Sequence, residues 1–146
     1  MVLTYAARAV SAAPRRELWS LLLDAASWPS WSAVDELVLE ESEGLAPDGR
    51  DGVGATRAFR TGRVVTVERI TALDPPRRLA YEGVRSAFIS DYAAVIELDE
   101  TSSGGTVIRW SGSYTARRGT GWLMRRIMRG MMQRMADGLA SSSSAQ

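Results

Sequence analysis

The residue types able to do chemistry are few in this sequence, because His, Cys, Lys and Asn are absent. The absence of His and Cys excludes a Ser-His-Asp triad, a thiol nucleophile, a disulfide and the commonest metal ligands. The absence of Lys excludes Schiff-base chemistry. We therefore expect no metal and no other cofactor. Any catalysis must use Arg, Tyr, Asp, Glu, Ser, Thr and bound water.

The charged residues of most interest are Arg57, Glu68 and Arg69, which fall in neighbouring segments of alternating apolar and polar residues. A hairpin turn at Thr61-Gly62 would place Arg57 diagonal to Glu68 on one face and Arg69 on the other. Apolar residues accompany both faces: Val65 and Val67 with Arg69, and Phe59, Val64 and Ile70 with Arg57. The pattern leaves open which arginine points inward, and a surface or rim position is the commoner outcome for each.

Four aromatic residues in later segments are predicted to point inward, because each shares a face with apolar residues of its own segment. They are Tyr81, Tyr92, Trp110 and Tyr114. A buried tyrosine hydroxyl needs a hydrogen-bond partner, so each could orient a polar ligand or only bond the backbone. Trp28 and Trp31 could gate a cavity or only cover the end of a helix.

These residues must be positioned by a strand, a helix and a series of short strands. Residues 2–10 predict the first strand, and Pro14 suits the first turn of a helix over 15–26 with one apolar face. Pro29 ends this helix. Segments of period two, separated by Gly, Pro, Asp and Ser turns, predict six further strands. They span residues 34–43, 55–60, 63–71, 78–84, 91–99 and 106–114.

The clearest predicted element is an amphipathic helix over 119–139. Its apolar arc carries Met124, Ile127, Met128, Met131, Met132, Met135 and Leu139. Its polar side carries Arg125, Arg126, Arg129, Gln133, Arg134 and Asp137. The methionines could pack on the sheet and also line a ligand cavity, because their flexible side chains fill irregular apolar spaces.

Length and charge limit the remaining possibilities. The 146 residues favour one domain over 1–140, with a disordered tail over 141–146. No apolar stretch is long enough to span a membrane, and no secretory signal is visible, so we expect a cytoplasmic protein. Residues 117–146 carry six arginines and one aspartate although the whole chain has a net charge of +1. These arginines lack interleaved aromatic residues, which argues against binding of nucleic acid. They are consistent with a helix face exposed to solvent or with a surface that binds an acidic carrier protein.

Together these segments resemble the START-like, helix-grip superfamily known as SRPBCC, and within it the polyketide cyclase/dehydrase group. The similarity begins with Ala13 to Leu22 and Trp28-Pro29-Ser30-Trp31. It continues in Gly52 to Arg57, Val67 to Tyr81 and Gly104 to Trp110, in order over nearly the whole chain. The resemblance implies an α+β fold, in which a curved antiparallel sheet of about seven strands surrounds a long C-terminal helix. Two short helices would follow the first strand, and a hydrophobic cavity would lie between sheet and helix.

The resemblance also implies roles for particular residues. In the aromatase/cyclases of this superfamily, a cavity arginine acts with Tyr or Ser hydroxyls and water to polarise carbonyls, enolise and dehydrate. Arg69 lies where that arginine falls, and Arg57 and Tyr81 are the other catalytic candidates. The residues expected to line the cavity are Trp28, Trp31, Phe59, Val67, Tyr92, Ile96, Trp110, Tyr114, Met124, Ile127, Met128, Met131 and Met135.

Three functions are compatible with this reading, because a fold does not by itself determine a function. The first is a polyketide cyclase/dehydrase-like protein that folds and dehydrates a bound polyketide. The second is a carrier or sensor of a lipid-, quinone- or sterol-like ligand, which the missing His, Cys, Lys and Asn favour. The third is a protein-interaction module that uses the basic helix face.

Overall fold

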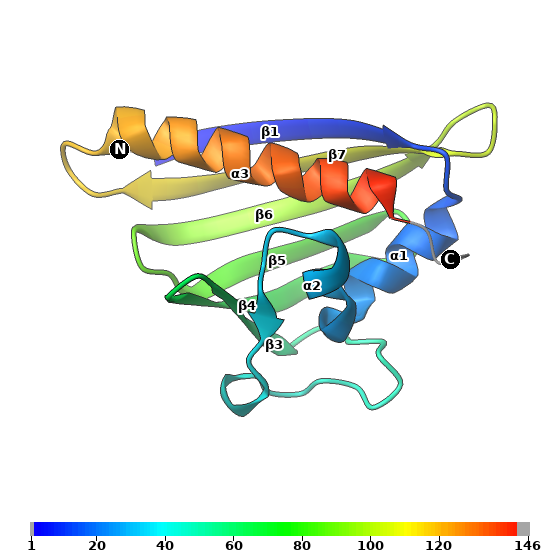
Figure 1. Cartoon of the computed structure of the whole chain (residues 1–146), viewed down its shortest axis with the longest axis horizontal. Helices are drawn as coiled ribbons and strands as arrows, with labels where there is room; N and C mark the ends of the chain where they lie inside the picture. The colour runs from blue at the N-terminus through cyan, green and yellow to red at the C-terminus, as the bar shows by residue number, and fades with distance from the viewer. Residues whose placement is uncertain (1, 143–146) are drawn as a thin grey trace.

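A computed structural model of the protein describes residues 2–142 as an α+β fold with one curved antiparallel sheet (Figure 1). The strands are β1 (Val2–Ser11), β2 (Glu36–Leu37), β3 (Thr56–Thr61), β4 (Val64–Asp74), β5 (Arg78–Arg85), β6 (Ile89–Glu100) and β7 (Thr106–Ala116). They lie in the order β1-β7-β6-β5-β4-β3-β2, so that β2 to β7 form a meander and β1 pairs with β7. The predicted fold class is confirmed.

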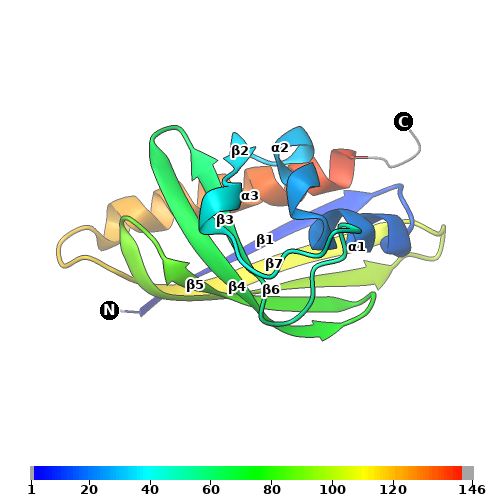
Figure 2. The same cartoon turned by 90° about the horizontal axis from the view of Figure 1, so that it is seen from below.

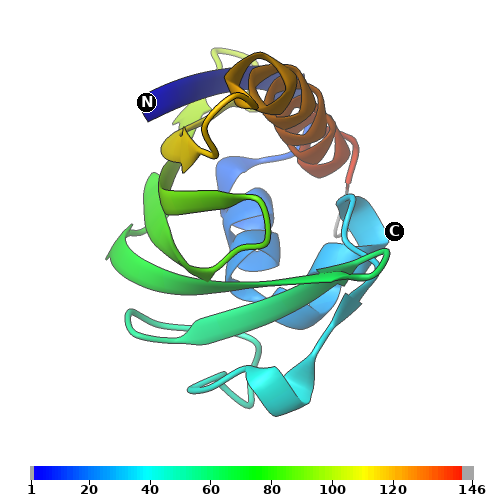
Figure 3. The ribbon, with the colours of Figure 1, turned by 90° about the vertical axis from the view of Figure 1, so that its left-hand side faces the viewer.

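Helices occupy the concave side of this sheet. They are α1 (Arg15–Leu23), α2 (Trp28–Trp31) and α3 (Gly121–Ser141), with 3₁₀ turns at Ala25–Ser27 and Leu39–Glu41. The sheet curls around α3, which packs mainly on β1 (Figure 3). Gly138 permits α3 to cross α2 closely, because a Cβ atom there would lie only 1.9 Å from the carbonyl oxygen of Trp31.

Alternation of apolar and polar residues builds the long strands and gives the sheet its apolar inner face. In β1, Leu3, Tyr5 and Ala7 are buried and the residues between them are exposed. β1 pairs with β7 without interruption from Val2 opposite Thr115 to Ser11 opposite Thr106. The inner side chains of β1, β6 and β7 pack with α1, α2 and α3 into one hydrophobic core.

The predicted strand over 34–43 is wrong for most of its length. Glu36–Leu37 pairs with β3, the chain then turns through Leu39–Glu41, and Glu43 returns to β3 only as an isolated bridge to Thr56. Leu37, Val38 and Leu39 are consecutive apolar residues, and an alternating strand cannot direct all three to one face. Val38 is buried, whereas Leu39 is 65% exposed.

The β3–β4 hairpin turns at Gly62-Arg63, one residue later than predicted. Thr61 pairs with Val64, and Gly62 has a φ of +62°, which glycine adopts without strain. The shift places Arg57 directly opposite Glu68 rather than diagonal to it. As Figure 2 shows, this hairpin and the β5–β6 turn lie toward the same end of the molecule as the start of α3.

Two predicted boundaries also change. The predicted helix over 15–26 ends at Leu23, and residues 28–31 form α2, with Pro29 in its first turn, as the second of the two short helices expected after the first strand. Of the tail predicted over 141–146, Ser141 is the last residue of α3, and residues 143–146 lie outside those that the structure describes. Within residues 2–142, no helix is long and apolar enough to cross a membrane.

Candidate functional site

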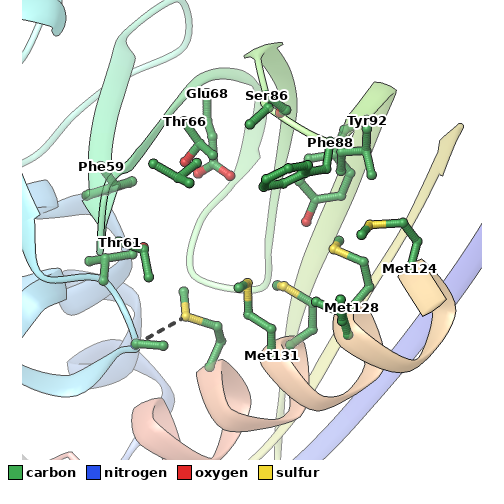
Figure 4. A pocket seen from close by; sticks show the side chains of 18 of the residues that line it. Phe59, Thr61, Thr66, Glu68, Ser86, Phe88, Tyr92, Met124, Met128 and Met131 are labelled. Atoms are coloured by element: carbon green, nitrogen blue, oxygen red, sulfur yellow. Dashed lines mark hydrogen bonds between the residues drawn. The ribbon is translucent and has the colours of Figure 1, made fainter. Parts of the chain in front are cut away.

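A cavity of about 540 Å³ lies between α3 and the concave side of the sheet (Figure 4). Its volume is within the range of pockets that hold small molecules. The β3–β4 hairpin, the β5–β6 turn and α3 supply most of its wall. The α3 methionines in the wall are Met124, Met128, Met131, Met132 and Met135. These flexible side chains allow one cavity to fit ligands of different apolar shapes.

Glu68 is the only acidic side chain among the described residues that line this cavity, and Figure 4 shows its carboxyl group directed inward. Its Oε1 atom is enclosed and has no hydrogen-bond partner among these residues. Burial raises the pKa of this carboxyl from 4.5 to about 7, although attraction to Arg57 opposes the rise. At neutral pH the group therefore divides between its acid and carboxylate forms, so it is able both to give and to take a proton.

Arg57 lies behind the cavity wall, fully buried. Its Nη1 donates to the carbonyl oxygen of Leu22 at 2.7 Å, and its Cζ lies over the Trp28 ring, 4.8 Å from the centroid. Burial lowers the pKa of Arg57, and the charges of Glu68 and Asp51 oppose that shift. Trp28 lines the cavity and Arg57 does not. The arginine therefore acts on the cavity through its electrostatic attraction to Glu68.

Asp51 approaches the same guanidinium from the loop between β2 and β3. Its Oδ2 lies 4.0 Å from Nη1 of Arg57, and its Oδ1 accepts a hydrogen bond from the Ala46 amide at 2.8 Å. The Asp51 amide donates to the carbonyl oxygen of Leu23, which ties the loop to the end of α1. Arg57 thus lies between a loop carboxylate and a strand carboxyl. No group of three or more His, Cys, Asp and Glu within residues 2–142 is arranged to hold a metal ion.

Tyr81 and Tyr92 bring two hydroxyls to the cavity wall as part of a hydrogen-bonded chain. Trp110 Nε1 donates to the Tyr81 hydroxyl at 3.0 Å, the Tyr81 and Tyr92 oxygens are 2.9 Å apart, and the Tyr92 and Tyr5 oxygens are 2.5 Å apart. Burial raises the pKa of both cavity tyrosines, so they stay protonated. If Tyr5 donates to Tyr92 and Tyr92 donates to Tyr81, the Tyr81 hydroxyl is free to donate its own hydrogen bond to a ligand.

Arg69 and Val67 lie on the convex side of the sheet, away from the cavity. Arg69 Nη1 donates to Glu82 Oε1 at 3.0 Å, and each of these side chains is 45% exposed. Val67 packs in a small separate cluster with Val38 and Ala58. The Arg57 face is therefore the concave one, because Arg57 is fully buried whereas the Arg69 side chain is 45% exposed.

Most of the predicted site residues come together in the cavity wall. These are Trp28, Phe59, Tyr81, Tyr92, Met124, Ile127, Met128, Met131 and Met135. Four other predicted residues are buried in the core without lining the cavity: Trp31, Ile96, Trp110 and Tyr114.

The predicted lining omits Glu68, Thr66, Phe88, Leu123 and Met132, all of which line the cavity. Thr66 and Glu68 lie at period-two spacing with Val64 and Ile70, so the sequence already placed them on the same strand face as these apolar residues. No comparable signal marks Phe88, because it belongs to a turn whose direction depends on the strands on either side.

Comparison with known proteins supports this fold. The model of the family described as polyketide cyclase / dehydrase and lipid transport matches residues 3–143. A search of curated proteins finds no match. A START superfamily protein from Mycobacterium smegmatis superposes with a TM-score of 0.76 at 10% identity over 94% of each chain. The protein XoxI from Bacillus cereus gives 0.72 at 17% identity over 95% of this chain and 92% of that one.

A plant enzyme also shares the fold. A point mutant of norcoclaurine synthase from Thalictrum flavum, in complex with a transition-state analogue, superposes with a TM-score of 0.70 at 17% identity. The alignment covers 96% of this chain and 92% of the synthase. At such identities the solved structures establish the fold alone, whereas the family model spans nearly the whole chain. The chain therefore belongs to the polyketide cyclase/dehydrase and lipid transport family of the START-like SRPBCC superfamily.

Proposed function

We propose that the protein binds a hydrophobic carbonyl compound of the polyketide type in the cavity under α3, and that Glu68 moves protons on it. The family and the apolar cavity wall support binding of a hydrophobic small molecule. The catalytic part rests on one observation, the Glu68 carboxyl with an enclosed oxygen that has no partner among the described residues. An ionisable group in an apolar pocket, with a pKa near neutrality, suits general acid–base work.

The proposed reaction is enolisation followed by loss of water. The Glu68 carboxylate takes a proton from the carbon next to a ketone, and the C–H electron pair forms the enolate as the ketone oxygen gains negative charge. The Tyr81 hydroxyl donates a hydrogen bond to that oxygen. Protonated Glu68 then gives its proton to a hydroxyl on the β-carbon. The C–O bond breaks and water leaves, while the enolate electrons form the new C=C bond and restore the carbonyl.

Arg57 has a positioning role in this proposal. Its charge favours the carboxylate form of Glu68, while burial favours the acid form, and the two influences together support a pKa of about 7. Neither Arg57 nor Arg69 is among the described residues of the cavity wall. We therefore assign polarisation of the carbonyl to Tyr81, which is in the wall.

Deuterium exchange tests the proton transfer directly. The probe is 2-tetralone, a bicyclic ketone with exchangeable hydrogens next to its carbonyl, incubated in D₂O buffer with the full chain and followed by NMR. We expect exchange faster than in buffer alone, rising with pH around a midpoint of about 7 as the Glu68 carboxylate forms. Glu68→Gln should reduce the rate on the order of a hundredfold.

The matched control is Glu82→Gln, because Glu82 is an exposed carboxylate on the convex side. It should exchange 2-tetralone as fast as the wild type. Binding is measured separately by quenching of tryptophan fluorescence, since Trp28 lines the cavity. Glu68→Gln that binds 2-tetralone and keeps the wild-type exchange rate would overturn the role of Glu68.

A carrier without chemistry is the second candidate function. The observation that favours it is the methionine-rich α3 wall, which contacts apolar groups of many shapes and offers no acid or base. Tight binding of 2-tetralone by the wild type, with exchange no faster than in buffer, would favour the carrier.

A further inference from the structure

Large apolar side chains are exposed where the cavity meets the surface. Phe88 of the β5–β6 turn and Leu123 and Ile127 of α3 line the cavity, yet they are 55%, 40% and 42% exposed. Trp122, in the first turn of α3, is 71% exposed. The β5–β6 turn and the start of α3 lie at one end of the molecule (Figure 1). We call these four residues the apolar rim; exposed apolar groups beside a cavity mark an interaction surface.

A group of arginines accompanies the apolar rim in sequence and in space. Arg117, Arg118, Arg125, Arg126 and Arg129 belong to the β7–α3 loop and the first turns of α3, and all are exposed. The ion pairs among the described residues involve arginines elsewhere, so none of these five lies within 4.0 Å of a carboxylate there. Residues 117–146 carry a net charge of +5 and residues 1–116 a net charge of −4.

We propose that this end of the molecule docks on the surface of an anionic phospholipid bilayer. Exposed Trp, Phe, Leu and Ile side chains insert at the boundary between headgroups and acyl chains, and arginines bind the surrounding phosphates. Docked in this way, the exposed part of the cavity wall, formed by Phe88, Leu123 and Ile127, faces the bilayer. A hydrophobic ligand then passes between membrane and cavity without crossing water. The proposal does not depend on any catalysis by Glu68.

The combination of groups favours a bilayer over an acidic protein. A carrier protein with a negative surface would satisfy the arginines, but its charged groups would lie against Trp122 and Phe88. A bilayer interface satisfies both the arginines and the apolar side chains, because its phosphates and its hydrocarbon lie within the length of one side chain of each other. The charge asymmetry also orients the molecule, since the remainder of the chain is net negative and is repelled by the same surface.

Vesicle flotation tests the proposal with the full-length chain. The probes are vesicles of phosphatidylcholine alone and of equimolar phosphatidylglycerol and phosphatidylcholine, in low salt. We expect the protein to float with the anionic vesicles only and to be released by added salt. Arg125→Gln/Arg126→Gln should weaken this binding about thirtyfold, and Trp122→Ser about tenfold.

Matched controls use residues far from the apolar rim. Arg16→Gln/Arg50→Gln removes the same charge from two exposed positions on α1 and the β2–β3 loop, and Leu39→Ser removes an apolar side chain that is 65% exposed. Both controls should float like the wild type. Loss of flotation in these controls equal to that of the test variants would overturn the proposed surface. Binding to an acidic acyl carrier protein through the same arginines, with no binding to anionic vesicles, would overturn it in favour of a protein partner.

Discussion

Two arginine–glutamate pairs that involve β4 have the same residue types and opposite surroundings. Glu68 faces the concave side, opposite Arg57 of β3, and both belong to the enclosed part of the molecule. Arg69, the next residue of β4, faces the convex side and bonds Glu82 of β5, with both side chains 45% exposed. The first pair sets the protonation of a cavity group, whereas the second only joins two strands at the surface.

The difference shows how burial changes the energetic contribution of the same two residue types. A solvent-exposed ion pair is screened by water and contributes about 0–1 kcal/mol. A buried charge that loses its partner keeps its desolvation penalty, so removing the partner costs several kcal/mol. Neighbouring residues of one strand therefore carry very different energetic consequences. The predictions below test this contrast.

The largest effect is expected from Arg57→Met, which removes the buried charge and keeps most of the volume. Asp51 and Glu68 then lack their cation, and the free energy of unfolding should fall by about 3–5 kcal/mol, measured by urea denaturation at pH 7. Arg69→Met is the control, with an expected loss below about 1 kcal/mol. Equal losses in the two variants would contradict the contrast. If Arg57→Met does not fold, Arg57→Met/Glu68→Met should recover part of the stability, because one unpaired carboxyl is gone.

Glu68→Gln should change the pH dependence of stability. The folded-state pKa of Glu68 is raised from 4.5 to about 7, so the folded protein holds this proton more tightly than the unfolded chain. Wild-type stability should therefore fall as pH rises from 4.5 through about 7, by up to about 3 kcal/mol in total. Glu68→Gln should lack this fall, as shown by urea denaturation at several pH values. Glu82→Gln should keep the wild-type slope, and a Glu68→Gln curve parallel to the wild type would rule out the raised pKa.

A smaller effect is expected from the tyrosine hydroxyls, which extend the comparison to neutral buried groups. Tyr92→Phe removes the middle oxygen of the Tyr5–Tyr92–Tyr81 chain and leaves two hydroxyls without this partner, at a cost of about 1–3 kcal/mol. Tyr114→Phe removes a buried hydroxyl that has no partner among the described residues, so it should be neutral or stabilising. Thermal unfolding of both variants measures the difference, and an equal loss would show that the hydrogen-bonded chain adds nothing.

Long periodic segments allowed the long helix and most of the strands to be predicted, whereas the curvature of the sheet and the cavity were expected only from the family resemblance. The apolar stripe of α3 and the alternation in β6 and β7 extend over enough residues to outweigh local exceptions. The predicted strand over 34–43 was too long, because Leu37 packs against the main core and Val38 joins the separate cluster with Ala58 and Val67, which leaves Leu39 65% exposed. Contacts with residues far away in the sequence decided where this strand ends, and the local pattern contains no information on such contacts.

The candidate site was harder to predict because it depends on single-residue details. A turn at Gly62-Arg63 instead of Thr61-Gly62 changes the residue opposite Arg57 from Thr66 to Glu68. The packing of the helices on one side of the sheet, and not this turn, decides which face is concave. Asp51 reaches Arg57 from a loop without periodicity, held by bonds to Ala46 and Leu23. Such contacts join segments far apart in the sequence, so residue spacing does not predict them.

The smallest expected effect concerns the convex pair, and it makes the comparison quantitative. A double-mutant cycle with Arg69→Ala, Glu82→Ala and both together should give a coupling energy of about 0.2–1 kcal/mol, because water reaches both side chains. Added salt should reduce this coupling, since the charges are screened. The parallel cycle with Arg57→Met and Glu68→Gln should give a larger coupling that salt hardly changes, because solvent ions do not reach the enclosed guanidinium. A convex coupling as large as the concave one, and equally resistant to salt, would mean that burial does not separate the two pairs.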